Sequence, residues 1–331
     1  MDLDAYVAEH AGEWRRMEHL SGRRKLSAQE ADELIALYQR AATHLSVIRS
    51  RSPDPALVAR LSRMVFAARS AITGGSRFSW RNVGRFFTVT FPLEVYRTGR
   101  WWVTIGLAFW ALSMGLAVYV AGHPEVALAF KTEEEIDQLV NSDFAGYYSE
   151  YQAQNFALLV WTNNAWVSAL CLASGILIVP VIYLLSATAL NLGILGGIMI
   201  GHGRWDVFFG MVLPHGLLEL TAVFVAAGAG LRIGWAWIAP GPLRTRGRAL
   251  AETARSAMLI ALGLVGVLAV SGLLEAFVTP SGLPPLLTVT LGAMCWVAFL
   301  MYVFVLGSKA AAEGESTDLD PALGEATVPT A

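Results

Sequence analysis

The stretch FALLVWTNNAWVSALCLASGILIVPVIYLLSATALNLGILGGIMIG, residues 156–201, decides the fold class of this chain. It contains no charged side chain over 46 residues (201 − 156 + 1). A transmembrane helix needs roughly 20 apolar residues to cross about 30 Å of hydrocarbon. The stretch is therefore too long for one crossing, and we expect two antiparallel spans joined by a turn near residues 180–187.

Four further apolar runs complete an expected all-α polytopic bundle of about six transmembrane helices. They cover residues 101–121, 207–233, 257–278 and 286–306, so the membrane domain is predicted at 101–307, with an acidic extracytoplasmic loop at 122–155. The composition agrees, because 55% of the residues are hydrophobic and only 15% are charged, against about 25% in soluble domains. These values exclude a disordered chain, a disulfide scaffold and a nucleic-acid-binding protein.

Residues 1–75 are predicted to form a cytosolic helical unit. Apolar residues recur at helical spacing in three segments, which begin near Leu3, Ser27 and Asp54. Ser27 and Glu30 have the spacing of a capping box, in which each side chain binds the other residue's backbone N–H. Three such helices can just bury a small core of their own, or they can dock onto the membrane domain.

The two segments that flank the membrane domain differ in charge. Residues 76–100, SRFSWRNVGRFFTVTFPLEVYRTGR, interleave arginines with aromatic residues, a pattern that suits an interfacial helix on the anionic headgroups of membrane lipids. The alternative is a positively charged lead-in to the first span with no further role. Residues 308–331 are acidic and rich in Ala, Gly, Thr and Pro, so we expect a disordered tail.

The distribution of charge predicts the orientation. Residues 1–100 carry 16 Lys and Arg residues, and the remainder of the chain carries 8. The loop between the fourth and fifth spans is rich in arginine, whereas the loop between the first and second spans has Lys131 alone among seven acids. The positive-inside rule then places both termini in the cytoplasm of a bacterium and the acidic loop outside its plasma membrane.

Few ionisable side chains fall inside the predicted spans, where an unpaired charge is costly. His215 and Glu219 lie one helical turn apart in the fourth span, and Glu275 lies in the fifth. Under the predicted topology these three belong to the outer half of the membrane, level with amides at the start of the second span and with the loop GHGRWD at 201–206. We therefore predict one polar cluster that contains Asn163, Asn164, His215, Glu219 and Glu275, with Asn155 nearby.

Three interpretations of this cluster remain open. The first is structural, because buried polar groups bind one another and fix the register of helices. The second is a binding site for a lipid headgroup, a substrate or a partner's loop. The third is a metal site, weighed last, because His202 with Asp206 and His215 with Glu219 have i,i+4 spacing but the HExxH pattern of metalloproteases is absent. We accordingly expect no catalytic residue, cofactor or metal.

Glycines in the third and fourth spans are predicted to let helix backbones approach closely. No Lys-Ser/Thr pair follows them, so they do not form a phosphate loop. The glycines concerned are Gly193, Gly196, Gly197, Gly201, Gly228 and Gly230.

Several motifs resemble the stage II sporulation protein M family of bacterial membrane proteins. The most specific is PHGLLE at 214–219, followed by AAGAGLRIG at 226–234. Asn163-Asn164, the run LNLG at 190–193 with Gly196-Gly197, and EAFV at 275–278 before Pro280 are similar to other spans of that family. The long N-terminal unit and the acidic tail resemble the broader, non-sporulating branch.

The resemblance implies an integral membrane protein without catalysis of its own. The named member is a membrane anchor that recruits peptidoglycan-degrading partners. Genes of the broader branch often lie beside one for a MoxR-type ATPase, and the fold is thought to resemble permease subunits of ABC transporters. We therefore expect a non-enzymatic scaffold that forms homo-oligomers and has cell-wall enzymes as outer partners. The alternative is a permease-like subunit that works with a MoxR-type or ABC-type ATPase, and a metal-dependent hydrolase ranks last.

Overall fold

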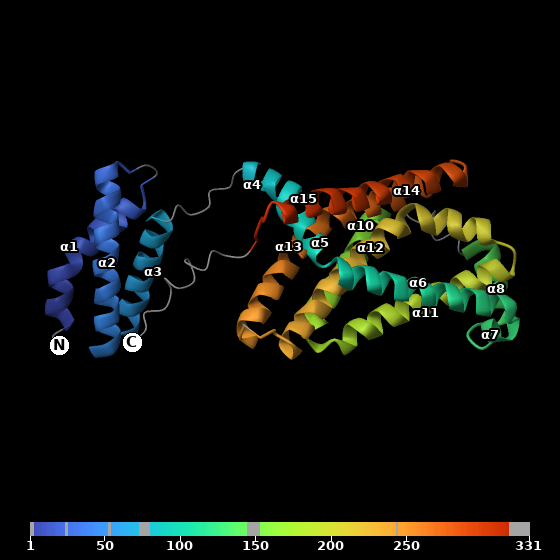
Figure 1. Cartoon of the computed structure of the whole chain (residues 1–331), viewed down its shortest axis with the longest axis horizontal. Helices are drawn as coiled ribbons and strands as arrows, with labels where there is room; N and C mark the ends of the chain where they lie inside the picture. Colours follow the sequence, from blue (N-terminus) through green and yellow to red (C-terminus); the bar gives the residue numbers. More distant parts are fainter. Residues whose placement is uncertain are drawn as a thin grey trace. The chain divides into compact units, whose positions relative to one another are not determined.

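The computed structural model describes residues 3–23, 26–51, 54–72, 80–143, 153–242 and 244–317. Regular structure in these residues is entirely helical (Figure 1). The chain divides into two compact units, Met1–Asn82 and Val83–Ala331, each with its own hydrophobic core. The all-α class predicted from hydropathy is confirmed.

The N-terminal unit is a three-helix bundle. Its helices are α1 (Leu3–Ser21), α2 (Ala28–Arg51) and α3 (Pro55–Ile72), and each contacts the other two. The predicted capping box starts α2, because the Ser27 N–H donates to Glu30 Oε2 at 2.9 Å and the Glu30 N–H donates to Ser27 Oγ at 3.2 Å. Residues from all three helices, including Trp14, Leu34 and Leu61, fill the core.

The second unit begins with short helices and continues into long ones. Its elements are α4 (Trp80–Arg85), a π-helical turn (Phe86–Thr90), α5 (Phe91–Arg97), α6 (Gly99–Gly122), α7 (Pro124–Leu128), α8 (Glu133–Gln138), a second π-helical turn (Leu139–Asp143), α10 (Ala153–Ser174), a 3₁₀ turn (Gly175–Leu177), α11 (Val179–Gly201), α12 (Trp205–Ile238), α13 (Arg246–Leu273), a π-helical turn (Leu274–Val278), α14 (Pro285–Met301), a π-helical turn (Tyr302–Leu306) and α15 (Gly307–Ala312).

Five helices in the described residues are long and apolar enough to cross a membrane. They are Gly99–Gly122, Val179–Gly201, Trp205–Ile238, Arg246–Val278 and Pro285–Ala312. The 22-residue helix α10 occupies the position of the predicted second span. Its first residues lie among those whose side chains are outside the described set, so its assignment as a sixth span stays a prediction.

Helix α12 is the central element of the unit, and it contacts α6, α10, α11, α13 and α14 (Figure 1). A continuous run from Thr221 to Gly230 is buried on every side. A helix that is apolar all round has to be surrounded by other helices, which explains this position. At 1.5 Å per residue its 34 residues extend roughly 50 Å, longer than the hydrocarbon layer is thick.

The turn inside residues 156–201 lies earlier than predicted. Helix α10 ends at Ser174, and the chain reverses through Gly175–Leu177 and Ile178, so the prediction of a turn near residues 180–187 was wrong. Pro180 instead stands in the first turn of α11, where its missing N–H interrupts no helical hydrogen bond. The reversal requires φ of +62° at Ile178, a left-handed conformation that β-branched residues rarely adopt.

The predicted interfacial helix 76–100 is interrupted at Thr98, between α5 and α6. Residues 80–97 form α4, a π-helical turn and α5, and residues 76–79 lie outside the described residues. Trp80 and Phe87 are exposed, as an interfacial role requires, but Phe91 and Leu93 are buried against the bundle. Helix α5 packs on α13 and α15, so the second half of the segment belongs to the core rather than to the surface.

The C-terminal tail is ordered at its start, contrary to the prediction for residues 308–331. The last long apolar helix, Pro285–Ala312, continues past residue 308, and Glu315 then pairs with Arg85 at 2.6 Å. The Arg97 guanidinium donates to the Glu315 carbonyl oxygen at 2.8 Å. Residues 318–331 lie outside the described residues.

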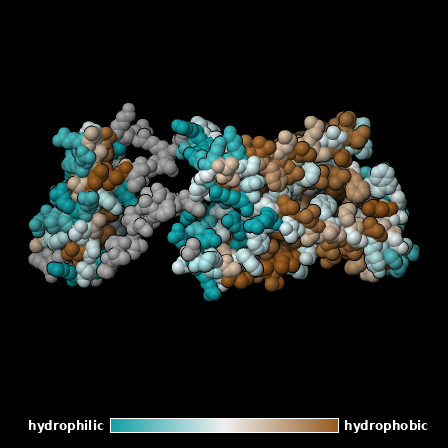
Figure 2. Space-filling model, in the orientation of Figure 1, coloured by the Kyte–Doolittle hydropathy of each residue, from teal (hydrophilic) through white to brown (hydrophobic). Residues whose placement is uncertain are grey.

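Figure 2 shows hydrophobic residues spread along the long helices of the second unit and hydrophilic residues at the end that carries α4. Exposed apolar side chains such as Leu107, Val118, Leu262 and Leu286 contribute to this surface. Apolar surface of this extent is expected to face lipid. We call the two ends of this unit the α4 end and the α7 end. Trp101 lies 6.2 Å from Trp235, ring centre to ring centre, so the start of α6 and the finish of α12 meet at the α4 end.

Candidate functional site

Three residues of the predicted polar cluster lie close together in the structure. His215 and Glu219 lie one turn apart on the same face of α12, and Glu275 approaches them from the end of α13. The ligand atoms of all three side chains lie within 4.8 Å of one another. His215 Nε2 is 3.8 Å from Glu275 Oε1, and these two residues are 6% and 5% exposed. The three side chains therefore form one compact site, buried at His215 and Glu275 and half-buried at Glu219, which we call the carboxylate–histidine cluster.

Local departures from regular helix aim these side chains. Pro214 precedes His215 inside α12, and a proline at that position removes one backbone hydrogen bond of the helix. Glu275 stands in the π-helical turn Leu274–Val278, and such turns add a residue that re-aims the side chains around them. Gly292 of α14 allows close packing at the same level, because a Cβ atom there would overlap the Pro214 carbonyl group.

Neighbouring hydroxyl groups orient the histidine. His215 Nδ1 lies 3.3 Å from Thr279 Oγ1. The Thr279 hydroxyl is also 3.4 Å from the carbonyl oxygen of Leu274, to which it can donate. These contacts hold the Nδ1 edge of the ring against the Thr279 hydroxyl, and the tautomer of His215 decides which of the two atoms donates. The other ring nitrogen of His215, Nε2, faces Glu275. Ser271 Oγ donates to the His215 carbonyl oxygen at 3.1 Å and fixes the backbone below the ring.

The two carboxylates are incompletely satisfied. Ser271 and Asn164 approach the Glu219 carboxylate as hydrogen-bonding side chains. Within the described part of the chain, however, Oε2 of Glu219 and Oε2 of Glu275 are buried and have no hydrogen-bond partner. Buried acceptors without a partner are rare in folded proteins, and each one calls for a bound proton, ion or water.

A cavity of about 460 Å³ adjoins the cluster. It lies between α11 and α12, and His215 and Glu219 line it together with Thr188 and Asn191. A second cavity, of about 340 Å³, reaches from Asp206 to Thr279. The first cavity therefore adjoins the cluster on the α11 side. Thr279 stands between the cluster and the second cavity, which lies near the contact of α12 with α14.

The other predicted site residues are arranged differently. Asn164 is half-buried and meets Glu219, but Asn163 is exposed, and the side chain of Asn155 lies outside the described residues. His202 and Asp206 are exposed, and neither belongs to the carboxylate–histidine cluster. His202 Nδ1 is instead 2.8 Å from the carbonyl oxygen of Ile198 in its own helix. The i,i+4 spacing in GHGRWD therefore brings no third ligand side chain to this pair among the described residues.

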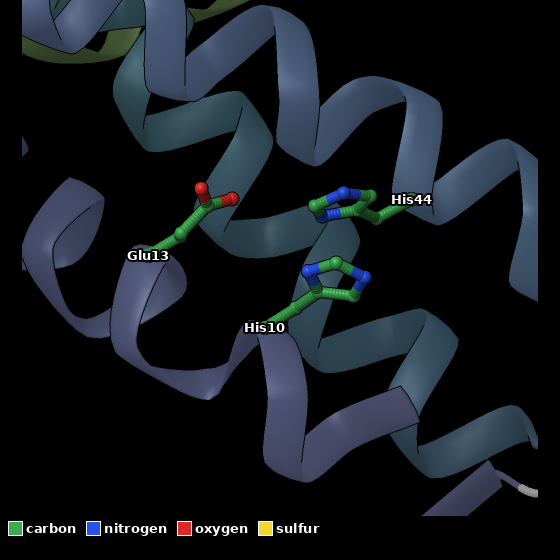
Figure 3. Close-up of side chains that lie close together, drawn as sticks. All are labelled: His10, Glu13 and His44. Carbon is green, nitrogen blue, oxygen red and sulfur yellow. The ribbon is translucent and has the colours of Figure 1, made fainter. Parts of the chain in front are cut away.

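A second cluster, in the N-terminal unit, was not predicted. His10 and Glu13 of α1 and His44 of α2 point toward one another (Figure 3), and their ligand atoms lie within 4.8 Å of one another. The two imidazoles are stacked, with ring centres 3.9 Å apart. Trp14 Nε1 donates to His44 Nδ1 at 3.2 Å, and Arg40 pairs with Glu13 at 3.0 Å. Because these groups already have partners, we interpret this cluster as helix packing.

Sequence reasoning also missed supporting residues whose types gave no signal. Ser271 and Thr279 are common in membrane helices, and only the fold shows that they contact His215. Glu94 is buried at the α4 end, where Ser256 and Thr317 donate hydrogen bonds to its carboxylate. A signal existed there, because Glu94 is the single acidic residue of segment 76–100.

Comparison with known families gives two matches. The model of the family described as Stage II sporulation protein M matches residues 103–280, which is more than half of the chain. A domain of unknown function, DUF8413, matches residues 4–74. No curated protein and no solved structure matches the chain. The first match spans all three residues of the carboxylate–histidine cluster, and the second spans the three-helix unit.

Proposed function

This chain belongs to the stage II sporulation protein M family, and from that premise we propose that it is a non-enzymatic membrane scaffold of the bacterial envelope. One observation carries the proposal. The chain builds a bundle with helices suited to a membrane and a separate three-helix unit with its own core. A protein with two such units can bind partners in two compartments at once.

The proposed orientation follows the charges. Arg81, Arg85, Arg97 and Arg100 precede the first span, and α13 begins with Arg246 and Arg248. Acidic residues, among them Glu125, Glu133 and Glu134, gather on α7 and α8 at the other end. The positive-inside rule then places the α4 end, both termini and the three-helix unit in the cytoplasm. Cell-wall enzymes would meet α7 and α8, and a MoxR-type ATPase would meet the three-helix unit.

Crosslinking in intact cells tests the scaffold. A photo-crosslinking residue at Glu134, on the exposed face of α8, is expected to capture peptidoglycan-degrading enzymes. The same residue at exposed Leu262, in the apolar part of α13, is the matched control and is expected to capture none. Equal recovery of wall enzymes from the two positions, or from neither, would contradict the proposal.

A permease-like subunit is the second candidate, and the cavity beside His215 and Glu219 favours it. Such a subunit needs an ATPase at its cytosolic face and a substrate that moves across the bundle. Purification in mild detergent separates the two candidates. A stoichiometric ATPase whose hydrolysis rate changes in Glu219→Gln supports transport, whereas an ATPase rate that is identical in the variant supports the scaffold.

A further inference from the structure

The carboxylate–histidine cluster has the composition of a metal site. One imidazole nitrogen and two carboxylates lie within 4.8 Å of one another and come from two helices that pack side by side. In the described residues, Oε2 of Glu219 and Oε2 of Glu275 are both buried without a hydrogen-bond partner at this place. Two buried carboxyl groups beside one imidazole cannot all stay unpaired in a low-dielectric interior, so this site has to hold protons or a cation.

We propose that His215, Glu219 and Glu275 bind one divalent transition-metal ion of the Zn²⁺ class, with a fourth position open to the cavity between α11 and α12. This inference goes beyond the scaffold role and does not depend on it.

The distances favour an ion over a direct contact. At 3.8 Å, His215 Nε2 and Glu275 Oε1 are too far apart for a hydrogen bond. Two ligands of a tetrahedral zinc ion, each about 2.1 Å from the metal, stand roughly 3.4 Å apart. A shift of a few tenths of an ångström would therefore bring both atoms to the ion. The unpartnered Oε2 atoms of Glu219 and Glu275 supply further lone pairs at the same place.

The surrounding groups also match those of known metal centres. Metal-bound histidines commonly donate their second ring N–H to an oxygen, which fixes the tautomer. Thr279 is in that position here. Nitrogen ligation selects Zn²⁺ and related ions over Mg²⁺ and Ca²⁺, which take oxygen ligands. Three protein ligands beside a cavity of about 460 Å³ leave a place for water or another small ligand, as in open zinc sites.

The test measures metal content and metal-dependent stability of the full chain in detergent. The protein is stripped with a chelator, reloaded with Zn²⁺, desalted and analysed for zinc, and its thermal unfolding midpoint is compared with and without Zn²⁺. We expect about one zinc per chain and a higher midpoint with Zn²⁺. Glu219→Gln and Glu275→Gln keep the side-chain shape and should each weaken Zn²⁺ binding at least tenfold. Co²⁺ in place of Zn²⁺ should give visible absorption bands that both variants lose.

Two controls keep the result interpretable. His202→Gln and Glu134→Gln remove the same residue types from exposed positions of the same unit and should bind zinc as wild type does. His10→Gln with His44→Gln removes the N-terminal cluster and should leave one zinc per chain. The proposal is overturned if wild type binds no zinc, if Glu219→Gln and Glu275→Gln retain it, or if only the His10/His44 variant loses it. It is equally overturned if the two Gln variants match wild type in midpoint with Zn²⁺ present, because the cluster would then hold protons.

Discussion

At the scale of single residues, His44 makes the N-terminal unit sensitive to acid. Burial lowers the pKa of His44 below its ordinary value of 6.5, and the neighbouring His10 lowers it further. Arg40 also lowers this pKa, whereas the carboxylates of Glu13 and Glu9 raise it. The folded unit therefore prefers neutral His44, and the unfolded chain binds more protons once the pH falls below about 6.5. The stability of α1–α3 should be constant at higher pH and should decline as the pH falls through that value.

Hydrogen–deuterium exchange of α1–α3 in the full chain, corrected for the intrinsic effect of pH, measures this loss. His44→Gln retains an acceptor for Trp14 but does not titrate, so its protection at pH 5 should be closer to that at pH 8 than in wild type. If the variant and wild type lose equal protection on acidification, His44 is not the group responsible.

The residue scale also shows what a single sequence can reveal about the candidate site. His215, Glu219 and Glu275 were predicted because an ionisable side chain in an apolar helix has to face a partner. Their convergence could be expected from the topology, but the π-helical turn at Leu274–Val278 could not. Nothing in the residue types distinguished Asn164, which meets Glu219, from exposed Asn163.

At the scale of helices, small residues decide which pairs pack closely. A Cβ atom on Gly230 would overlap the backbone carbonyl group of Cys171, so α12 and α10 are in contact through their main chains. The predicted packing role of the glycines is confirmed here and at Gly193 and Gly197, which face α6. Gly230→Ala should therefore force α10 away and lower the free energy of unfolding by about 2–3 kcal/mol.

Gly266→Ala on α13 is the matched control, because no atom lies within 4 Å of its Cβ position. Alanine is the better helix former, so this change should be neutral or stabilising by up to about 1 kcal/mol. Unfolding in detergent, followed by circular dichroism, measures both variants. A Gly230→Ala protein as stable as wild type would show that α10 can move aside at no cost.

Glu94 joins three elements at the α4 end. Its carboxylate accepts hydrogen bonds from Ser256 of α13 and from Thr317 beyond α15, and it lies 3.5 Å from Arg97. Because hydrogen bonds to a buried charged group are worth about 1.5–3 kcal/mol, Glu94→Ala should destabilise the unit by about 2–3 kcal/mol and speed amide exchange in residues 307–317. Glu313→Ala, whose side chain is 58% exposed, should change stability by less than about 0.5 kcal/mol. Similar exchange in the two variants would mean that Glu94 does not hold the C-terminal segment.

At the scale of the whole molecule, hydropathy predicted the fold class and the location of the spans because burial of apolar length in lipid is a coarse, additive property. Hydropathy could not predict the contacts between segments that are distant in the sequence. The helix that continues to Ala312 and the pairing of Glu315 with Arg85 depend on a few polar side chains that no periodicity encodes. The reversal at Gly175–Ile178 likewise depends on close backbone packing against Gly230 and Gly234.

The number of crossings follows from which side of the membrane two loops face. Between Glu134 of α8 and Arg246 at the start of α13 the chain passes through α10, α11 and α12. If α10 crosses the membrane, three crossings separate the two positions and they face opposite sides, whereas two crossings would place them on the same side. We therefore expect a membrane-impermeant maleimide to label Glu134→Cys in intact cells and Arg246→Cys only after the membrane is opened. Both side chains are exposed, so access is set by the bilayer rather than by packing. Labelling of both cysteines from the same side would remove α10 from the spans and leave only the five helices Gly99–Gly122, Val179–Gly201, Trp205–Ile238, Arg246–Val278 and Pro285–Ala312.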